Sequence, residues 1–239
     1  MALVRLLPVR GTQTQTNSSY GQLIPRVPPH TLLPLAQLIR PTFDLVTVPS
    51  SRGGTRTEFG DLPVFDVAIL PWPDRQRTGL LIAVGPSLVF PTATSRSAGQ
   101  GAWQAGPTLG AIYTGIPGLL VGFVAQNPIS FAYTSPNRPP QNTFEFQPVF
   151  ALHLWREWYL RSAEATWMIG WRRHYPTTLP LSIGIGRTFL SLDPRIPPTS
   201  FFVTGQWMAY RQFAPIAPQT TINFGITVAF PQLKSYWGP

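Results

Sequence analysis

The sequence predicts an all-β fold, a closed antiparallel up-and-down transmembrane β-barrel of ten to twelve strands. The first observation is that apolar and polar side chains alternate along many segments, without a break in residues 221–230, where every even position is apolar. Because side chains of a strand point alternately to opposite faces, such a segment has one apolar and one small or polar face. Repeated along a chain, this pattern is typical of a barrel with lipid outside and water inside.

Composition supplies the second and third observations. Only 11% of the 239 residues are charged, against roughly 25% in a typical soluble domain. The 28 Pro and 20 Gly are spread along the chain at intervals that favour short strands and turns over long helices. The longest nearly apolar run, residues 79–90, is shorter than the roughly 20 residues of a spanning helix.

We expect one barrel domain over residues 31–231, preceded by a mobile lead-in over 1–30 and followed by a tail over 232–239. Residues 22–27 of the lead-in can add a strand. The alternation predicts ten strands at residues 35–48, 57–70, 79–92, 102–115, 117–131, 141–155, 157–171, 179–192, 199–211 and 220–230.

The connections support an up-and-down order because they alternate in length. Residues 115–117 and 156–157 are tight turns, whereas 93–101 and 132–140 are longer and polar. Outer-membrane barrels have short periplasmic turns and longer outer loops.

The same alternation predicts which polar side chains line the interior. In 141–155 Phe144 and Phe146 share one face, which leaves Glu145 on the other, and a carboxylate facing lipid is disfavoured. By the same argument 35–48 places Arg40 and Asp44 inward. The predicted lumen-lining residues are Arg40, Asp44, Glu145, Gln147, His153, Glu164 and Gln206.

Three charged residues do not fit the alternation directly. Asp61 and Asp66 fall on opposite faces of one strand, which indicates either a bulge or a position near water at a strand end. Arg187 shares a face with Ile183 and Ile185. It either extends its charge to the membrane edge or is turned inward by a bulge.

Tryptophans lie towards the predicted strand ends, where the aromatic girdles of a membrane barrel belong. The alternative is an ordinary aromatic core of a β-sandwich. The residues expected at the membrane interface are Trp103, Trp155, Trp158, Trp171 and Trp207.

Other classes of function find little support. The three histidines, His30, His153 and His174, have no metal-ligand spacing, and Gly184-Ile185-Gly186 lacks the rest of a dinucleotide loop. The net charge of +9 lies mainly on arginines in connections rather than along one face, unlike a nucleic-acid binder. We therefore expect no enzyme, no cofactor, no metal and no nucleic-acid partner.

A set of spaced motifs resembles one bacterial outer-membrane family, the proteins labelled meta-pathway phenol-degradation or transporter proteins. The resemblance covers residues 35–233 and implies an exported barrel linked to uptake of aromatic compounds. It implies no catalytic residues. The matching motifs include Gly85-Pro86, Phe90-Pro91-Thr92-Ala93-Thr94, Gln147-Pro148-Val149-Phe150, Trp158-Tyr159-Leu160, Gly184 with Gly186 and Arg187, and Val228-Ala229-Phe230-Pro231.

Together these arguments predict a bacterial outer-membrane barrel that acts as a narrow passive channel or transporter for small molecules, aromatic or phenolic compounds among them. Its partners would be outer-membrane lipids, the solute and the outer-membrane assembly machinery. The first ten residues do not resemble a signal peptide, so we expect an export signal upstream of this numbering. Two alternatives stay open: a structural or interaction barrel whose lumen is plugged by residues 1–29, and a soluble lipocalin-like binding barrel.

Overall fold

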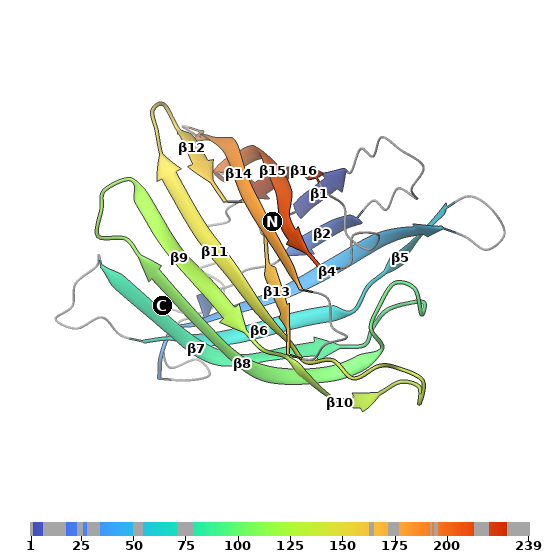
Figure 1. The fold of residues 1–239 in the computed structure, drawn as a ribbon. Helices are drawn as coiled ribbons and strands as arrows, with labels where there is room; N and C mark the ends of the chain where they lie inside the picture. Colours follow the sequence, from blue (N-terminus) through green and yellow to red (C-terminus); the bar gives the residue numbers. More distant parts are fainter. Residues whose placement is uncertain are drawn as a thin grey trace.

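The computed structural model describes residues 2–6, 18–22, 26–27, 34–49, 55–70, 79–162, 165–171, 177–191, 193, 196–212 and 220–228. Within these ranges the regular secondary structure consists of β-strands alone, and the strands form one antiparallel sheet (Figure 1). The all-β, antiparallel part of the sequence prediction is confirmed.

The strands differ in length, and the longest have 13 residues. In the first half of the chain they are β1 (Ala2–Leu6), β2 (Ser18–Gln22), β3 (Arg26–Val27), β4 (Gln37–Pro49), β5 (Thr55–Phe59), β6 (Leu62–Ile69), β7 (Leu80–Phe90), β8 (Ala102–Tyr113) and β9 (Leu119–Gln126). The others are β10 (Ile129–Tyr133), β11 (Thr143–His153), β12 (Trp158–Arg161), β13 (Trp167–Gly170), β14 (Thr178–Phe189), β15 (Thr199–Arg211) and β16 (Thr220–Val228).

Neighbours in the sheet follow the order of the chain. The pairings run from β4 through β6, β7, β8 and β9 to β11, and from β14 through β15 to β16. Between these runs β12 and β13 both pair with β11 and with β14. The first strand, β1, pairs with β2 on one side and with β16 on the other, so the first and the last described strands are neighbours.

All ten strands predicted from the alternation are present, and three of them are interrupted. The segment 57–70 is divided into β5 and β6, 117–131 into β9 and β10, and 157–171 into β12 and β13. At the second interruption Pro128 has no N–H to donate to a neighbouring strand. In addition, a Cβ added to Gly106 would lie only 1.9 Å from the carbonyl oxygen of Asn127. The missing Cβ therefore permits the close approach of the two strands.

Strands β1, β2 and β3 lie within residues 1–30, for which the sequence predicts a lead-in. β1 pairs with β2 and β16, and both β2 and β3 pair with β4, so these strands belong to the same sheet as the predicted barrel domain. Of the segment 22–27, for which a further strand is expected, Gln22 ends β2 and Arg26–Val27 form β3, whereas 23–25 lie outside the described residues. The tail at 232–239 lies outside the described residues.

The two faces of the sheet differ in polarity, as β16 shows most simply. Phe224 is 45% exposed, whereas its neighbour Asn223 is 5% exposed, and burial alternates with the pleat along the strand. We call the side carrying Asn223, Thr221 and Thr204 the buried face and the side carrying Phe224 the exposed face. Asn223 donates a 3.3 Å hydrogen bond from Nδ2 to Thr204 Oγ1 across the buried face.

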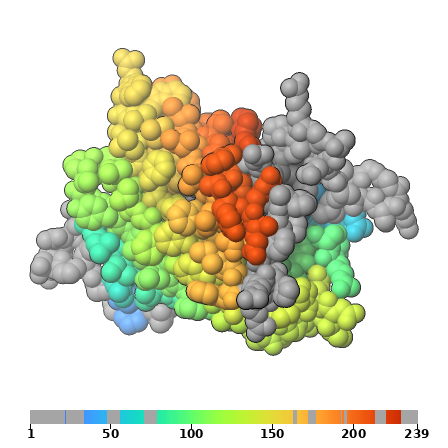
Figure 2. All heavy atoms as spheres, viewed as in Figure 1, coloured from blue at the N-terminus to red at the C-terminus, as the bar shows by residue number. Residues whose placement is uncertain are grey.

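The same division holds over much of the sheet, and it is the reverse of the distribution usual in a soluble protein. Side chains of neighbouring strands form a continuous outer surface (Figure 2), and large apolar side chains occupy many exposed positions. These include Phe43, Leu80, Val84, Leu88, Leu109, Phe131, Leu181, Ile183, Ile185, Phe201, Val203, Ile222, Phe224 and Ile226. The buried polar residues are Gln22, Gln37, Ser87, Gln104, Thr108, Ser162, Thr204, Thr221 and Asn223.

Buried apolar packing is limited. Phe65, Val67 and Ala83 form a small cluster, with Leu38 and Ile69 packed against it. This cluster lies on β4, β6 and β7 and fills part of the buried side next to the polar residues described below.

Within the described ranges, no helix combines the length and hydrophobicity needed to cross a bilayer.

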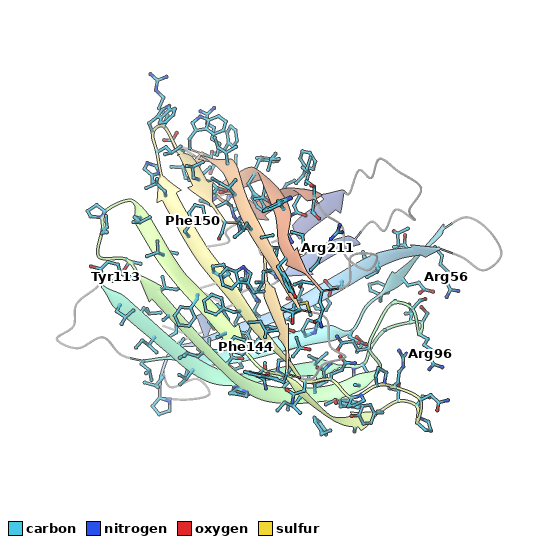
Figure 3. The ribbon with its side chains drawn as sticks, viewed as in Figure 1. Arg56, Arg96, Tyr113, Phe144, Phe150 and Arg211 are labelled. Atoms are coloured by element: carbon cyan, nitrogen blue, oxygen red, sulfur yellow. The ribbon has the colours of Figure 1, made fainter. Side chains whose placement is uncertain are left out.

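The strand ends form two edges of different character. The short connections 114–118 and 154–157 lie together, since Leu119 pairs with Leu152; we call this side the turn edge. The long connections 91–101 and 134–142 lie at the opposite, loop edge, where Gly101 accepts a hydrogen bond from the N–H of Thr134. Figure 3 shows Arg56 and Arg96 at the loop edge and Tyr113 at the turn edge. These four connections have the lengths predicted from the sequence, whereas the connection 190–198 at the turn edge is longer than the two short turns.

The pairing of β4 explains the opposite faces of Asp61 and Asp66. Leu45 pairs with Phe59, but Pro41 pairs with Val64, so one extra residue is accommodated around Gly60 and Asp61. This bulge turns Asp61 to the buried side. Asp66 stays on the other face, where both carboxylate oxygens accept 3.1 Å hydrogen bonds from Gln37 Nε2.

Candidate functional site: a polar cavity on the buried face

A cavity of about 610 Å³ lies on the buried face between β4, β6, β7, β8, β9 and β11. Its volume is in the range of small-molecule sites. Its polar lining residues are Gln22, Arg40, Thr42, Asp44, Asp61, Ser87, Ser97, Gln100, Gln104, Gln126, Glu145, Gln147 and Thr166. Four of the predicted lining residues, Arg40, Asp44, Glu145 and Gln147, are therefore brought together.

Arg40 is the cationic residue of this lining. It lies on β4 directly opposite Phe65 of β6, and its Cζ stands 4.2 Å above the centre of the Phe65 ring. A guanidinium is attracted to the face of an aromatic ring and keeps its N–H edge available while it stacks. Phe65 thus holds the Arg40 guanidinium flat against one wall.

Glu145 provides a negative charge in the same cavity. It lies opposite Gln126 in the pairing of β11 with β9, and Gln126 Nε2 donates a 2.5 Å hydrogen bond to Glu145 Oε2. The positive charge of Arg40 interacts electrostatically with this carboxylate. The cavity therefore contains opposite charges on strands that are far apart in the sequence.

The side chain of Asp61 binds loop 91–101 at the cavity. Its carboxylate accepts hydrogen bonds from the backbone N–H groups of Ala93 at 3.3 Å, Gln100 at 2.6 Å and Gly101 at 3.4 Å. A Cβ on Gly99 would lie 2.5 Å from Asp61 Oδ1, so this contact requires glycine. Residues 97–100 consequently line the cavity at the loop edge.

Two arginines tie this loop to its neighbour. Arg138 Nη1 donates to the carbonyl oxygens of Gly99 at 2.9 Å and Arg96 at 3.2 Å, and Arg96 Nη2 donates to the Asn137 carbonyl at 3.2 Å. Because charged donors form the stronger hydrogen bonds, these contacts fix loops 91–101 and 134–142 to each other.

Among the lining residues that the prediction missed is Asp61. Its position beside Gly60 within a strand is a sequence signal of a bulge, but the chain alone does not show which loop the carboxylate contacts. Those loop N–H groups lie up to 40 residues away.

The other predicted lining residues lie elsewhere. His153 is the last residue of β11 and is exposed at the turn edge. Gln206 shares the buried face of β15 with Phe202 and Thr204 but does not line the cavity. Glu164 lies outside the described residues.

The predicted interface tryptophans lie near strand ends. Trp155, 65% exposed, and Trp158 belong to the turn between β11 and β12 at the turn edge. Trp103, Trp171 and Trp207 lie towards the loop edge, and all three are exposed. Their role at a membrane interface stays a prediction.

Aromatic side chains also form a strip along the exposed face of β9, β11 and β13. Phe146 lies between Phe123, at 5.2 Å between ring centres, and Trp167, at 5.4 Å. Phe144, labelled in Figure 3, lies 5.9 Å from Trp171. Such contacts stabilise neighbouring strands without a core between them.

In the part of the chain that the structure describes, no group of three His, Asp or Glu side chains is placed to hold a metal ion. The cavity wall offers hydrogen-bond donors and acceptors, one stacked cation and carboxylates. This arrangement can orient a small polar molecule or an ion.

Comparisons with known proteins add no further assignment. No family model, no curated protein and no solved structure matches the chain. The resemblance described above stays a prediction.

Proposed function

We propose that the chain is a closed outer-membrane β-barrel that forms a narrow passive channel for small molecules. The observation that carries the proposal is the reversed polarity of the sheet: exposed Ile222, Phe224 and Ile226 alternate with buried Thr221 and Asn223. In water such a surface is costly, since apolar area stays solvated while polar groups are buried. In a bilayer the same arrangement is favourable.

The strand pairings support closure. The series of paired strands starts at β1, passes through β4, β8, β11 and β14 among others, and ends at β16. This last strand pairs again with β1. If β2 with β3, β5 with β6, β9 with β10 and β12 with β13 are each one interrupted pass, the sixteen strands make twelve passes. Twelve is even, as bacterial barrels require, and lies between the filled eight-stranded and the open sixteen-stranded size.

The cavity supports passage of small molecules. Arg40 and Glu145 would place opposite charges on the wall, and Phe65 would add an apolar surface beside them. A ring with a hydroxyl or carboxylate group matches this chemistry, which is consistent with the aromatic or phenolic solutes that the family resemblance implies. The turn edge would face the periplasm and the loop edge the exterior.

Single-channel recording tests the proposal directly. Protein refolded in detergent and inserted into planar bilayers should give small, steady conductance steps, and heat-denatured protein in the same detergent should give none. A folded, inserted protein without conductance and without solute flux in liposomes would contradict the channel.

A structural barrel with an occluded lumen is the second candidate. Residues 97–100 line the cavity at the loop edge, and the Phe65 cluster fills part of the buried side; both observations favour a restricted path. In that case the wild-type protein shows no conductance, and conductance appears only when loop 91–101 is released. The soluble lipocalin-like alternative needs the opposite distribution of polar and apolar faces.

A further inference from the structure

Arg187 is an arginine on the exposed, apolar face of the sheet. It lies on β14 two residues after Ile185, which is 45% exposed, and four after Ile183, which is 59% exposed. The pairing of β14 with β15 is regular from Pro180 to Phe189. No bulge therefore turns Arg187 to the buried side.

Aromatic rings surround the guanidinium of Arg187 at the turn edge. Its Cζ lies 5.0 Å from the centre of the Phe189 ring and 5.7 Å from that of Trp158. Trp158 is its direct neighbour on β12, and Phe201 is its direct neighbour on β15. The N–H of Thr188 donates a 3.0 Å hydrogen bond to the Glu157 carbonyl, which continues the pairing of β12 with β14 by one residue.

Among the described residues, no group satisfies the charge of Arg187. For the residues that the structure describes, Arg187 has neither a hydrogen bond nor an ion pair, and its Nε is buried without an acceptor. A buried donor without a partner is costly, and a guanidinium has five N–H groups to satisfy.

The contrast with Arg161 shows that stacking alone does not explain Arg187. Arg161 stands 4.1 Å above the Phe202 ring on the buried face and donates from Nε to the Ser162 carbonyl at 3.1 Å. Both arginines stack on rings. Only Arg187 faces outward and lacks an acceptor.

We propose that Arg187, held by Trp158 and Phe189, binds the phosphate group of a phospholipid at the turn edge. The inference rests on the proposed membrane location. The planar guanidinium matches two phosphate oxygens, and aromatic rings such as these are enriched at the depth of the lipid head groups. The acyl chains of that lipid lie along the exposed Ile185 and Ile183.

Native mass spectrometry of the refolded protein in detergent tests the site with three probes: phosphatidylglycerol, a diacylglycerol with the same chains, and inorganic phosphate. The wild-type protein should retain one phosphatidylglycerol at collision energies that remove diacylglycerol. Arg187→Gln should lose this adduct at least tenfold, and Arg187→Lys should retain it only in part. Arg161→Gln is the matched control and should retain it fully.

Three results would overturn the proposal. These are equal retention by wild-type protein and Arg187→Gln, equal retention of diacylglycerol and phosphatidylglycerol, and full displacement by inorganic phosphate, which would indicate a site for the free anion. Folding of each variant is checked by its heat-modifiable electrophoretic shift, and Arg187→Lys serves if Arg187→Gln does not fold. If the wild-type protein is monodisperse without detergent, the membrane location itself fails. If it inserts normally and Arg187→Gln retains the lipid, only the lipid site fails.

Discussion

The carboxylate of Asp61 accepts a 2.6 Å hydrogen bond from the backbone N–H of Gln100, 39 residues further along the chain. The Asp61 side chain, at the bulge between β5 and β6, thereby helps to hold loop 91–101 over the cavity. Hydrogen bonds to charged groups contribute about 1.5–3 kcal/mol. Asp61 therefore holds residues 97–100 at the cavity, while Arg96 and Arg138 hold the same loop to loop 134–142.

Asp61→Ala should release the loop and widen the path. We expect a larger single-channel conductance and flux of larger solutes through liposomes, with a loss of roughly 1–3 kcal/mol in the free energy of unfolding. Asp66→Ala is the matched control, since it removes a carboxylate bonded to Gln37 outside the cavity. Unchanged conductance in Asp61→Ala would show that loop 91–101 does not restrict the path.

The charges of Arg40 and Glu145 should control ion selectivity in opposite directions. Arg40→Gln removes a positive charge and should favour cations, whereas Glu145→Gln should favour anions. One charge about 8 Å from an ion in water is worth about 0.5 kcal/mol, or roughly a twofold change in permeability ratio. Reversal potentials in a salt gradient measure the ratio. Glu157→Gln at the exposed turn edge should leave it unchanged, and equal shifts in all three variants would exclude a selective role of the cavity.

Phe224→Arg tests the membrane location through stability. Phe224 is exposed in the middle of β16, so on a water-exposed surface the change should stay within about 0.5 kcal/mol. Facing the middle of a bilayer, an arginine costs roughly 2–4 kcal/mol, and near the interface only about 0–1 kcal/mol. Urea unfolding in liposomes should therefore show a large loss for Phe224→Arg and a small one for Trp155→Arg at the turn edge. Equal effects of the two changes would contradict a lipid-facing β16.

Gly186 should not tolerate a methyl group. An added Cβ would stand 2.5 Å from Cζ and Oη of Tyr159 and 2.8 Å from the Cβ of Phe202. Overpacking of this kind costs typically 1–3 kcal/mol, so Gly186→Ala should lower the urea midpoint. At Gly205 the nearest atom to an added Cβ is the Ile183 carbonyl oxygen at 3.9 Å. Gly205→Ala should therefore stay within about 0.5 kcal/mol of the wild type.

The turn between β11 and β12 contains removable strain. Arg156 and Glu157 have φ of 45° and 64°, a region that costs residues other than glycine about 1–2 kcal/mol each. Two-residue hairpin turns with positive φ at both positions prefer Asn-Gly. Changing Arg156 to Asn together with Glu157 to Gly should raise the free energy of unfolding by about 1 kcal/mol. An Ala-Ala pair at the same positions should give no such gain.

Much of the fold is predictable because the signal is local. The direction in which each side chain of β16 or β11 points follows from the pleat of a single strand, so Phe224 and Glu145 can be assigned to opposite faces without knowledge of any partner strand. The ten predicted strands, which correspond to β4–β16 with three of them divided, follow in the same way. For β1 the alternation is too short to be informative, and its partner β16 lies at the other end of the chain.

The candidate site is less predictable because it depends on pairing. The alternation assigns Asp61 to a face only relative to the other residues of its own strand. The bulge at Gly60 becomes visible only in the pairing of β5 and β6 with β4. Gln206 has the predicted orientation, but its distance from the cavity depends on where β15 lies in the sheet. Likewise, the pattern places Arg187 on the apolar face, whereas its contact with Trp158 requires the register between β12 and β14.

By itself, the sequence determined the alternation of polar and apolar faces, the number and order of most strands, and the short and long connections, because each depends on neighbouring residues alone. Only the tertiary structure decided that Asp61 holds loop 91–101, that Arg40 and Glu145 share a cavity, and that Arg187 stands between two rings. These contacts join segments that approach each other only when strands pair in one register, and a shift of one residue would reverse the face of every side chain in the strand.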